Sequence, residues 1–237
     1  MCLLKLQGVK KSFGGLVAVD ELNLQVPKGQ ISALIGPNGA GKTTIFNLIT
    51  GFLQSDEGEI EFDGKSLLNK KPHMVCRHGL SRTFQLVKTF GDLTVLENVM
   101  VGAFHFTTDK VKAKKEATKI IEFLGLTKEL DMKGEELTIS ARKRLEIARA
   151  MATKPKLLLL DEPMGGMNAT EIESMMSRLL EIRKNGVSLL IIEHVMKAIM
   201  RISDHITVIN YGKKIAEGTP KQISKNNDVI TAYLGED

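Results

Sequence analysis

Eight consecutive residues near the N-terminus have the spacing of a phosphate-binding loop. They match the pattern G-x-x-x-x-G-K-[ST], and Thr44 comes directly after them. The eight residues are Gly36, Pro37, Asn38, Gly39, Ala40, Gly41, Lys42 and Thr43. Glycines let the backbone wrap tightly, so that successive N–H groups point at phosphate oxygens. The lysine of this pattern reaches the β- and γ-phosphates of a nucleotide, and the hydroxyl of Thr43 binds Mg²⁺. The sequence therefore predicts a site for a nucleotide with Mg²⁺.

Two acidic residues, Asp161 and Glu162, follow the apolar run of residues 157–160. A buried strand would deliver Asp161 to its carboxyl end, where an open α/β sheet binds ligands. Asp161 would then hold Mg²⁺, and Glu162 could polarise the attacking water as a general base. Alone, an acidic turn after a strand would be the simpler interpretation. The phosphate-binding loop in the same chain favours a hydrolytic site instead.

Two further polar residues could belong to the same site. Gln85 follows the strand-like residues 82–84, and its amide could contact the metal or the water. His194 follows a predicted strand at residues 187–192 and could bond the γ-phosphate. From the residues alone, Gln85 could equally be an ordinary polar loop residue, and a lone histidine at a strand end is usually structural.

The elements that must position these residues alternate along the chain. Strands are predicted at residues 3–7, up to 26, 31–35 and 60–64, and residues 94–152 look helical, with a helix at 113–124. The last third predicts a strand at 156–160, a helix at 169–183, a strand at 187–192, a helix from about 194 and a strand at 204–210. This rhythm indicates an α/β fold with a parallel sheet covered by helices. The stripe formed by Met175, Met176, Leu179 and Ile182 is expected to be core.

Composition excludes several classes of protein. The 237 residues allow one domain or one core with a subdomain, and no apolar run approaches the roughly 20 residues needed to cross a membrane. We also expect no secretory signal and no disulfide framework from two cysteines. The net charge of +5 could suit nucleic acid or an anionic membrane surface, but a solvated surface explains it as well. With two Tyr and no Trp to stack on bases, we expect no nucleic-acid partner.

Over almost its full length the chain resembles the ATPase subunit of ABC transporters. The phosphate-binding loop, Gln85, the region of Leu137, residues 157–162 and His194 occur in the order and spacing of that family. The resemblance implies ATP and Mg²⁺ as ligands, with Gln85 and Asp161 beside Thr43 at the metal. It also implies that Phe13 stacks on adenine, that Gln85 couples the site to a transmembrane partner, and that His194 is the switch histidine.

The resemblance further implies a P-loop NTPase fold. Its core, residues 1–85 and 155–237, would hold a mostly parallel sheet and an antiparallel N-terminal β subdomain, and residues 86–154 would form a helical subdomain. Within the family the chain is most similar to the branched-chain amino acid import ATPases. The segments that carry this similarity are residues 13–19, 50–52, 82–85, 93–99 and 145–150.

This similarity implies a peripheral subunit on the cytoplasmic face of the cell membrane. Its partners would be transmembrane permease subunits, a second ATPase subunit, and a periplasmic or extracellular substrate-binding protein. Other functions stay open: urea import, lipid or polysaccharide export, a soluble ABC ATPase acting on DNA or ribosomes, and a weakly hydrolysing partner in an asymmetric ATPase pair.

The chain departs from the family in the signature segment, normally L-S-G-G-Q, which here reads L-T-I-S-A over residues 137–141. In the family this segment contacts the γ-phosphate bound by the other subunit, so Thr138 and Ser140 are the expected nucleotide contacts. Ile139 and Ser140 replace glycines, and Ala141 lacks an amide. Two interpretations remain: a tolerated variant, or a chain that needs a partner with the full signature.

Overall fold

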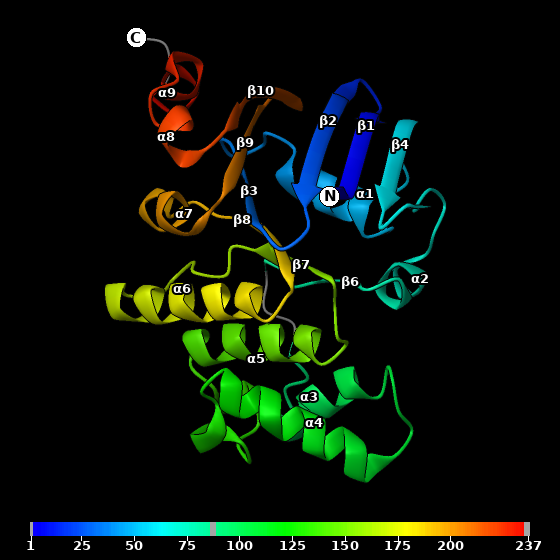
Figure 1. The fold of residues 1–237 in the computed structure, drawn as a ribbon, viewed down its shortest axis with the longest axis vertical. Helices are drawn as coiled ribbons and strands as arrows, with labels where there is room; N and C mark the ends of the chain where they lie inside the picture. The colour runs from blue at the N-terminus through cyan, green and yellow to red at the C-terminus, as the bar shows by residue number, and fades with distance from the viewer. Residues whose placement is uncertain (1, 86–88, 235–237) are drawn as a thin grey trace.

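The structure is a computed structural model and describes residues 2–85 and 89–234. Its strands form two sheets, one antiparallel and one mostly parallel (Figure 1). This arrangement confirms the predicted α/β class and its antiparallel N-terminal part.

The smaller sheet is built by the N-terminal part of the chain. Its order is β2-β1-β4-β5, all antiparallel, with β1 (Cys2–Phe13), β2 (Leu16–Pro27), β4 (Glu57–Phe62) and β5 (Lys65–Ser66). Leu4 and Leu6 of β1 are buried because alternate side chains of a strand share one face. Phe13 and Leu16, where β1 turns into β2, are exposed. The hairpin therefore carries an exposed aromatic ring at its end.

The larger sheet places the candidate residues together at the carboxyl ends of its parallel strands. Its order is β10-β9-β3-β8-β7-β6, parallel except for the β9–β10 pair. Its strands are β3 (Ile31–Ile35), β6 (Leu80–Arg82), β7 (Leu157–Asp161), β8 (Ser188–Ile192), β9 (His205–Asn210) and β10 (Lys213–Gly218). The phosphate-binding loop follows β3, Glu162 follows β7 and His194 follows β8. Neighbouring parallel strands thus bring these segments together at their carboxyl ends.

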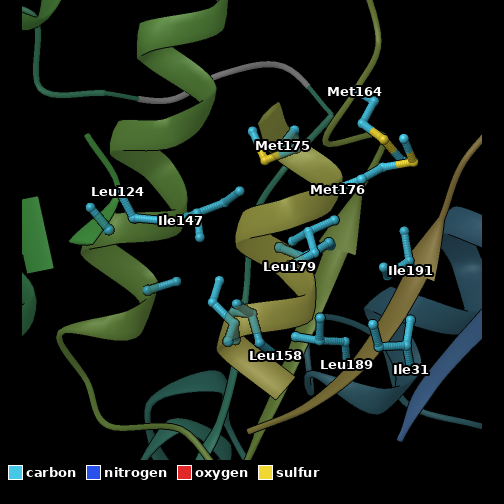
Figure 2. Close-up of a cluster of buried hydrophobic side chains, with 14 of the residues drawn as sticks. Ile31, Leu124, Ile147, Leu158, Met164, Met175, Met176, Leu179, Leu189 and Ile191 are labelled. Atoms are coloured by element: carbon cyan, nitrogen blue, oxygen red, sulfur yellow. The ribbon is translucent and has the colours of Figure 1, made fainter. Parts of the chain in front are cut away.

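Two apolar cores lie on opposite faces of the larger sheet. Leu34, Leu159 and Leu190 pack toward the smaller sheet and α1 (Lys42–Ile49). The intervening side chains of the same strands pack toward α6 (Ala169–Lys184), where Figure 2 shows Met175 and Met176 among them. The methionine stripe is therefore core, as predicted.

A group of helices lies at the end of the molecule away from the smaller sheet (Figure 1). It contains α3 (Val95–Ala103), α4 (Lys110–Phe123) and α5 (Ile139–Met151), with short 3₁₀ turns at Thr127–Glu129 and Gly134–Glu136. Thr94, Asp109 and Thr138 cap the N-termini of α3, α4 and α5 through side-chain oxygens. These elements confirm the helical middle of the chain.

The remaining helices are α2 (Pro72–Arg77), α7 (Met196–Ile202), α8 (Pro220–Ile223) and α9 (Asn227–Leu234). Helix α7 begins at Met196, slightly later than expected, because the Glu193 carboxylate accepts the backbone N–H groups of His194 and Val195. Within residues 2–85 and 89–234, no helix is long and apolar enough to cross a membrane.

Candidate functional site

The loop between β3 and α1 depends on its glycines. Gly39 and Gly41 have φ angles of 80° and 103°, a region that glycine adopts without strain. A Cβ atom on Gly41 would lie 2.4 Å from the backbone oxygen of Ala18 in β2. Glycine is therefore required both by the turn and by its close packing on the smaller sheet.

Lys42, the first residue of α1, folds back over this loop. Its Nζ atom donates to the backbone oxygens of Gly36 at 2.6 Å and Pro37 at 2.8 Å. Burial lowers the pKa of Lys42, while the charges of Glu162 and Asp161 oppose that shift. Gly36 and Pro37 thus form the base of the loop and hold the lysine.

A cavity of about 510 Å³ opens beside the loop. It gathers eleven of the predicted site residues from five parts of the chain: Phe13, Asn38, Gly39, Ala40, Gly41, Lys42, Thr43, Thr44, Gln85, Glu162 and His194. Phe13 is 46% exposed at its mouth, and Tyr211, which the sequence did not single out, is 84% exposed on the same rim. The cavity therefore combines a cationic loop, an acid and two aromatic rings.

Three side chains meet at one carboxylate oxygen on the cavity wall. Oε1 of Glu162 accepts a hydrogen bond from Nε2 of Gln85 at 3.1 Å and lies 3.0 Å from Nε2 of His194. Glu162 has a φ of 52°, which is rare for a residue with a side chain. Its backbone is held on both sides, since its N–H donates to Ile192 and its carbonyl oxygen accepts from Nζ of Lys143. The structure thus brings together the three residues predicted to be catalytic.

Asp161 lies behind the cavity wall, at the end of β7. Its Oδ2 is 3.4 Å from Nη2 of Arg82, and its backbone N–H donates to the hydroxyl of Thr83. Burial raises the pKa of Asp161, and the charge of Arg82 opposes that rise. The carboxylate is therefore a buried neighbour of the cavity rather than part of its lining.

Arg82 ties several parts of the site together. Its guanidinium donates to the side-chain oxygens of Asn47 at 2.7 Å and Thr50 at 3.3 Å in and after α1. It also lies over three aromatic rings, those of Phe46, Phe52 and Phe84. In the sequence, Arg82 is visible only as part of the family-like segment 82–85, because its partners are distant along the chain.

Glu193 is a second residue that the sequence analysis missed. Its side chain is 1% exposed, and its oxygens accept the backbone N–H groups of Met164 at 2.6 Å, His194 at 2.7 Å and Val195 at 3.1 Å. Glu193 therefore fixes the loop after Glu162 and the start of the His194 segment at the same time. Its position next to a candidate histidine was the one signal in the sequence.

Thr138 and Ser140 do not lie at this cavity. Thr138 caps α5, accepting the backbone N–H of Ala141 at 3.3 Å, and Ser140 is half-buried in the first turn of the helix. Between them Ile139 is 60% exposed. The structure therefore places the altered signature apart from the phosphate-binding loop of its own chain.

A groove of about 520 Å³ lies between α2, β6 and the ends of α3 and α5. Its lining is largely apolar and also contains Arg82 and the half-buried Cys76; the apolar side chains include Phe52, Phe84, Phe90, Val101 and Phe104. The ring of Phe90 lies 5.1 Å below the guanidinium of Arg149. The segment expected to couple the site to a transmembrane partner contains Gln85, and residues 86–88, which follow it, lie outside the described part of the chain.

The family model described as ABC transporter matches residues 19–165. The chain belongs to the ABC transporter family. A second model, described as branched-chain amino acid ATP-binding cassette transporter, matches residues 213–237 of this ABC subunit. These matches confirm the ABC-type, transport-coupled ATPase predicted from the sequence.

Curated relatives match this ABC subunit over nearly its whole length. The high-affinity branched-chain amino acid transport ATP-binding protein BraF of Pseudomonas aeruginosa is 42% identical, covering 99% of this chain and 98% of BraF. The corresponding protein LivG of Escherichia coli is 40% identical, covering 99% of this chain and 98% of LivG. A probable LivG of Archaeoglobus fulgidus is also 40% identical, with coverages of 99% and 96%.

Solved structures agree with the fold. A nucleotide-free ATP-binding cassette from an ABC transporter superposes with a TM-score of 0.91 at 34% identity, covering all of both chains. The ADP conformation of such a cassette gives a TM-score of 0.90 at 34% identity, again over both full chains. The P-loop NTPase fold implied by the resemblance is therefore confirmed for this ABC subunit.

Proposed function

We propose that the chain hydrolyses ATP in the cavity beside its phosphate-binding loop and thereby powers the import of branched-chain or related amino acids. The observation that carries the proposal is the meeting of Gln85, Glu162 and His194 at one carboxylate oxygen on the wall of that cavity. The names of the relatives support this class of transported molecule.

ATP would enter with its base at the open end of the cavity. Phe13 offers a ring for stacking on adenine. The N–H groups of the loop and the N-terminus of α1 would surround the phosphates. Lys42 would exchange its two bonds to loop carbonyls for bonds to the β- and γ-phosphates, which neutralise its charge better than neutral oxygens do.

Three oxygen-bearing side chains fit a magnesium ion. Mg²⁺ prefers oxygen ligands: Thr43 and Gln85 supply a hydroxyl and an amide oxygen on the cavity lining, and Asp161 supplies a buried carboxylate behind it, paired with Arg82. These residues would hold the ion, and when bound it supplies positive charge to the β- and γ-phosphates.

Glu162 is positioned to act as the general base. As the oxygen of a water molecule forms its bond to the γ-phosphorus, Oε1 of Glu162 would accept a proton from that water. The bond from the γ-phosphorus to the bridging oxygen breaks, and ADP and inorganic phosphate leave. Gln85 donates to the same carboxylate oxygen and orients it, while His194, 3.0 Å away, is placed to bond the γ-phosphate.

The apolar groove would receive a transmembrane permease subunit. We infer that residues 86–154 act as a helical subdomain beside a nucleotide-binding core of residues 1–85 and 155–237, with the groove at their junction. A peripheral position on the cytoplasmic face of the membrane follows from this docking. A periplasmic or extracellular substrate-binding protein of the same system would deliver the amino acid.

A second ATPase subunit would complete each site. Thr138 and Ser140 lie apart from the cavity of their own chain, and Ile139 is 60% exposed between them, so the segment is available to another subunit. That subunit would be either another copy of this chain or a related chain with the full signature.

The test is Mg²⁺-dependent ATP hydrolysis by the purified chain, with Glu162→Gln as its matched variant. We expect Glu162→Gln to bind ATP with similar affinity but to lose turnover, because an amide cannot accept the proton. Equal turnover by both proteins would show that Glu162 is not the base. ATP binding without turnover by the unmodified chain would show that a partner subunit is needed.

A further inference from the structure

A third hollow, of about 360 Å³, lies at the tip of the helical group, apart from the ATP cavity. The end of α3, the outer face of α4 and the end of α5 enclose it. Four lysines line it, three from α4 and one after α5: Lys112, Lys115, Lys119 and Lys154. The mechanism of ATP hydrolysis uses none of them.

The charge of this basic hollow is only partly neutralised. Its lining contains one acidic side chain, Glu116, whose carboxylate lies 3.3 Å from Lys119 and 3.8 Å from Lys154. Four lysines and one glutamate give the lining a net charge of +3, and Asp109, whose carboxylate lies 3.9 Å from Lys112, reduces the local charge to +2. Lys110 and Lys114 on the same helix are also exposed. The hollow is thus suited to an anionic ligand with several phosphate or carboxylate oxygens.

Two features besides charge shape this basic hollow. Phe106 is 53% exposed, and Nζ of Lys154 lies 5.6 Å from the centre of its ring. Lys154 has a φ of 52°, in the region where a residue after a helix is most often glycine. The chain therefore carries a lysine at a backbone position that disfavours any side chain, and that lysine reaches an exposed aromatic ring.

The basic hollow continues the surface of the apolar groove. Phe104 and His105 line the groove, whereas the next residues, Phe106 and Thr107, line the hollow. If the groove receives a transmembrane subunit, as proposed above, the adjoining hollow faces the surface of the bilayer beside that subunit. This step rests on the proposed function.

We propose that the basic hollow binds anionic phospholipid headgroups at the membrane surface. Ammonium groups pair with phosphate oxygens, and the cytoplasmic leaflet carries negative charge that attracts clustered lysines. Exposed aromatic side chains beside lysines are typical of surfaces that lie against a bilayer. The hollow would therefore fix the subunit against the membrane next to its permease.

The test measures partition of the purified full-length chain onto vesicles of phosphatidylcholine, alone or with one quarter phosphatidylglycerol. We expect binding only to the anionic vesicles, and its loss at high salt, where the Debye length falls to about 3 Å at 1 M. Replacing Lys112, Lys115 and Lys119 together by Gln should lower the partition constant about a hundredfold, at roughly fivefold per lysine.

A matched variant distinguishes binding at this basic hollow from a general effect of the net charge of the protein. Lys28, Lys221 and Lys225 are exposed, lie outside the hollow, and lose the same charge when all three are replaced by Gln. We expect little change in partition for this control. Lys154→Gly should weaken partition about fivefold while leaving the melting temperature unchanged or higher, because glycine relieves the left-handed backbone.

ATP binding and hydrolysis by each variant are measured in parallel. Three results would each overturn the inference. The chain could bind neutral and anionic vesicles equally, or both triple variants could lose the same amount of vesicle partition. Duplex DNA carrying the same total charge as the lipid could also displace the chain from the vesicles. If ATP is hydrolysed but anionic vesicles are not bound, the inference fails and the proposed function stands. If selective vesicle binding persists in a chain that neither binds nor hydrolyses ATP, the proposed function fails and the lipid site stands.

Discussion

The carboxylate of Glu162 must be placed accurately, yet the backbone of this residue has a strained conformation. Left-handed geometry costs a residue with a Cβ about 1–2 kcal/mol, and here φ is 52°. The surroundings compensate: Ile192 and Lys143 hold its backbone, while Gln85 and His194 hold its carboxylate. Side chains from two other segments therefore hold one carboxylate oxygen on the cavity wall, and two further contacts hold the backbone that carries it.

Glu193 should matter to activity although it does not line the cavity. Glu193→Gln replaces one acceptor oxygen with an NH₂ group that faces backbone N–H groups, at a cost of about 2 kcal/mol in the free energy of unfolding. Urea unfolding measures that loss. Turnover should fall with it, because the loops carrying Glu162 and His194 both lose an anchor, while ATP affinity stays similar.

Glu181→Gln is the control for charge, since Glu181 is exposed on α6. Equal losses of stability in both variants would contradict the role of the Glu193 hydrogen bonds.

We expect the two aromatic residues on the rim of the cavity to contribute unequally to ATP affinity. Stacking of a base on an aromatic ring is worth about 1–3 kcal/mol, so Phe13→Ala should weaken ATP binding at least about fivefold. Tyr211→Ala should weaken it less, because Tyr211 is 84% exposed. Titration with a fluorescent ATP analogue compares them. A larger loss in Tyr211→Ala would place adenine against Tyr211 instead of Phe13.

At the scale of elements, helices α3 and α5 approach each other closely at Gly102. A Cβ on Gly102 of α3 would lie 2.3 Å from the backbone oxygen of Arg149 in α5. Gly102→Ala should therefore separate the two helices and cost about 1–3 kcal/mol in the free energy of unfolding. Gly15→Ala is the matched control, because a Cβ there meets nothing within 4 Å. Similar unfolding midpoints for both variants would contradict this packing argument.

The long elements could be predicted from the sequence because their patterns are local. The apolar run of β7 and the periodic face of α6 both appear in consecutive residues. In contrast, β6 has three residues and α8 has four, too few for a period to show. The phosphate-binding loop was predictable for the same reason, since its pattern is contiguous.

The supporting residues of the site could not be predicted in this way. Arg82 and Asp161 are 79 residues apart, and Glu193 and Met164 are 29 residues apart. Each pair meets only because neighbouring strands of the sheet end together. A single Arg, Glu or Lys beside a strand has no sequence pattern that distinguishes an anchor from a surface residue.

At the scale of the whole molecule, the altered signature makes a prediction about assembly. Ile139→Gly combined with Ser140→Gly removes two Cβ atoms where the family has backbone near phosphate. If these two Cβ atoms weaken the closure of two copies of the chain on ATP by about 1.4 kcal/mol, turnover of the double variant should rise about tenfold. Steady-state ATP hydrolysis over a range of protein concentrations measures this. An unchanged rate would favour a tolerated variant.

Ile139→Ala is the informative control because it shortens the exposed side chain but keeps Cβ. If it raises turnover as much as the double variant does, the bulk of the isoleucine, rather than the loss of glycine, limits closure.

The half-buried Cys76 on the wall of the apolar groove gives the protein a built-in reporter. A maleimide reagent should modify Cys76 in the free chain and modify it more slowly once a permease covers the groove. Cys2, which is exposed at the start of β1, provides an internal reference whose labelling should not change. Peptide mass spectrometry of the two thiols would thus follow assembly of the transporter without any introduced label.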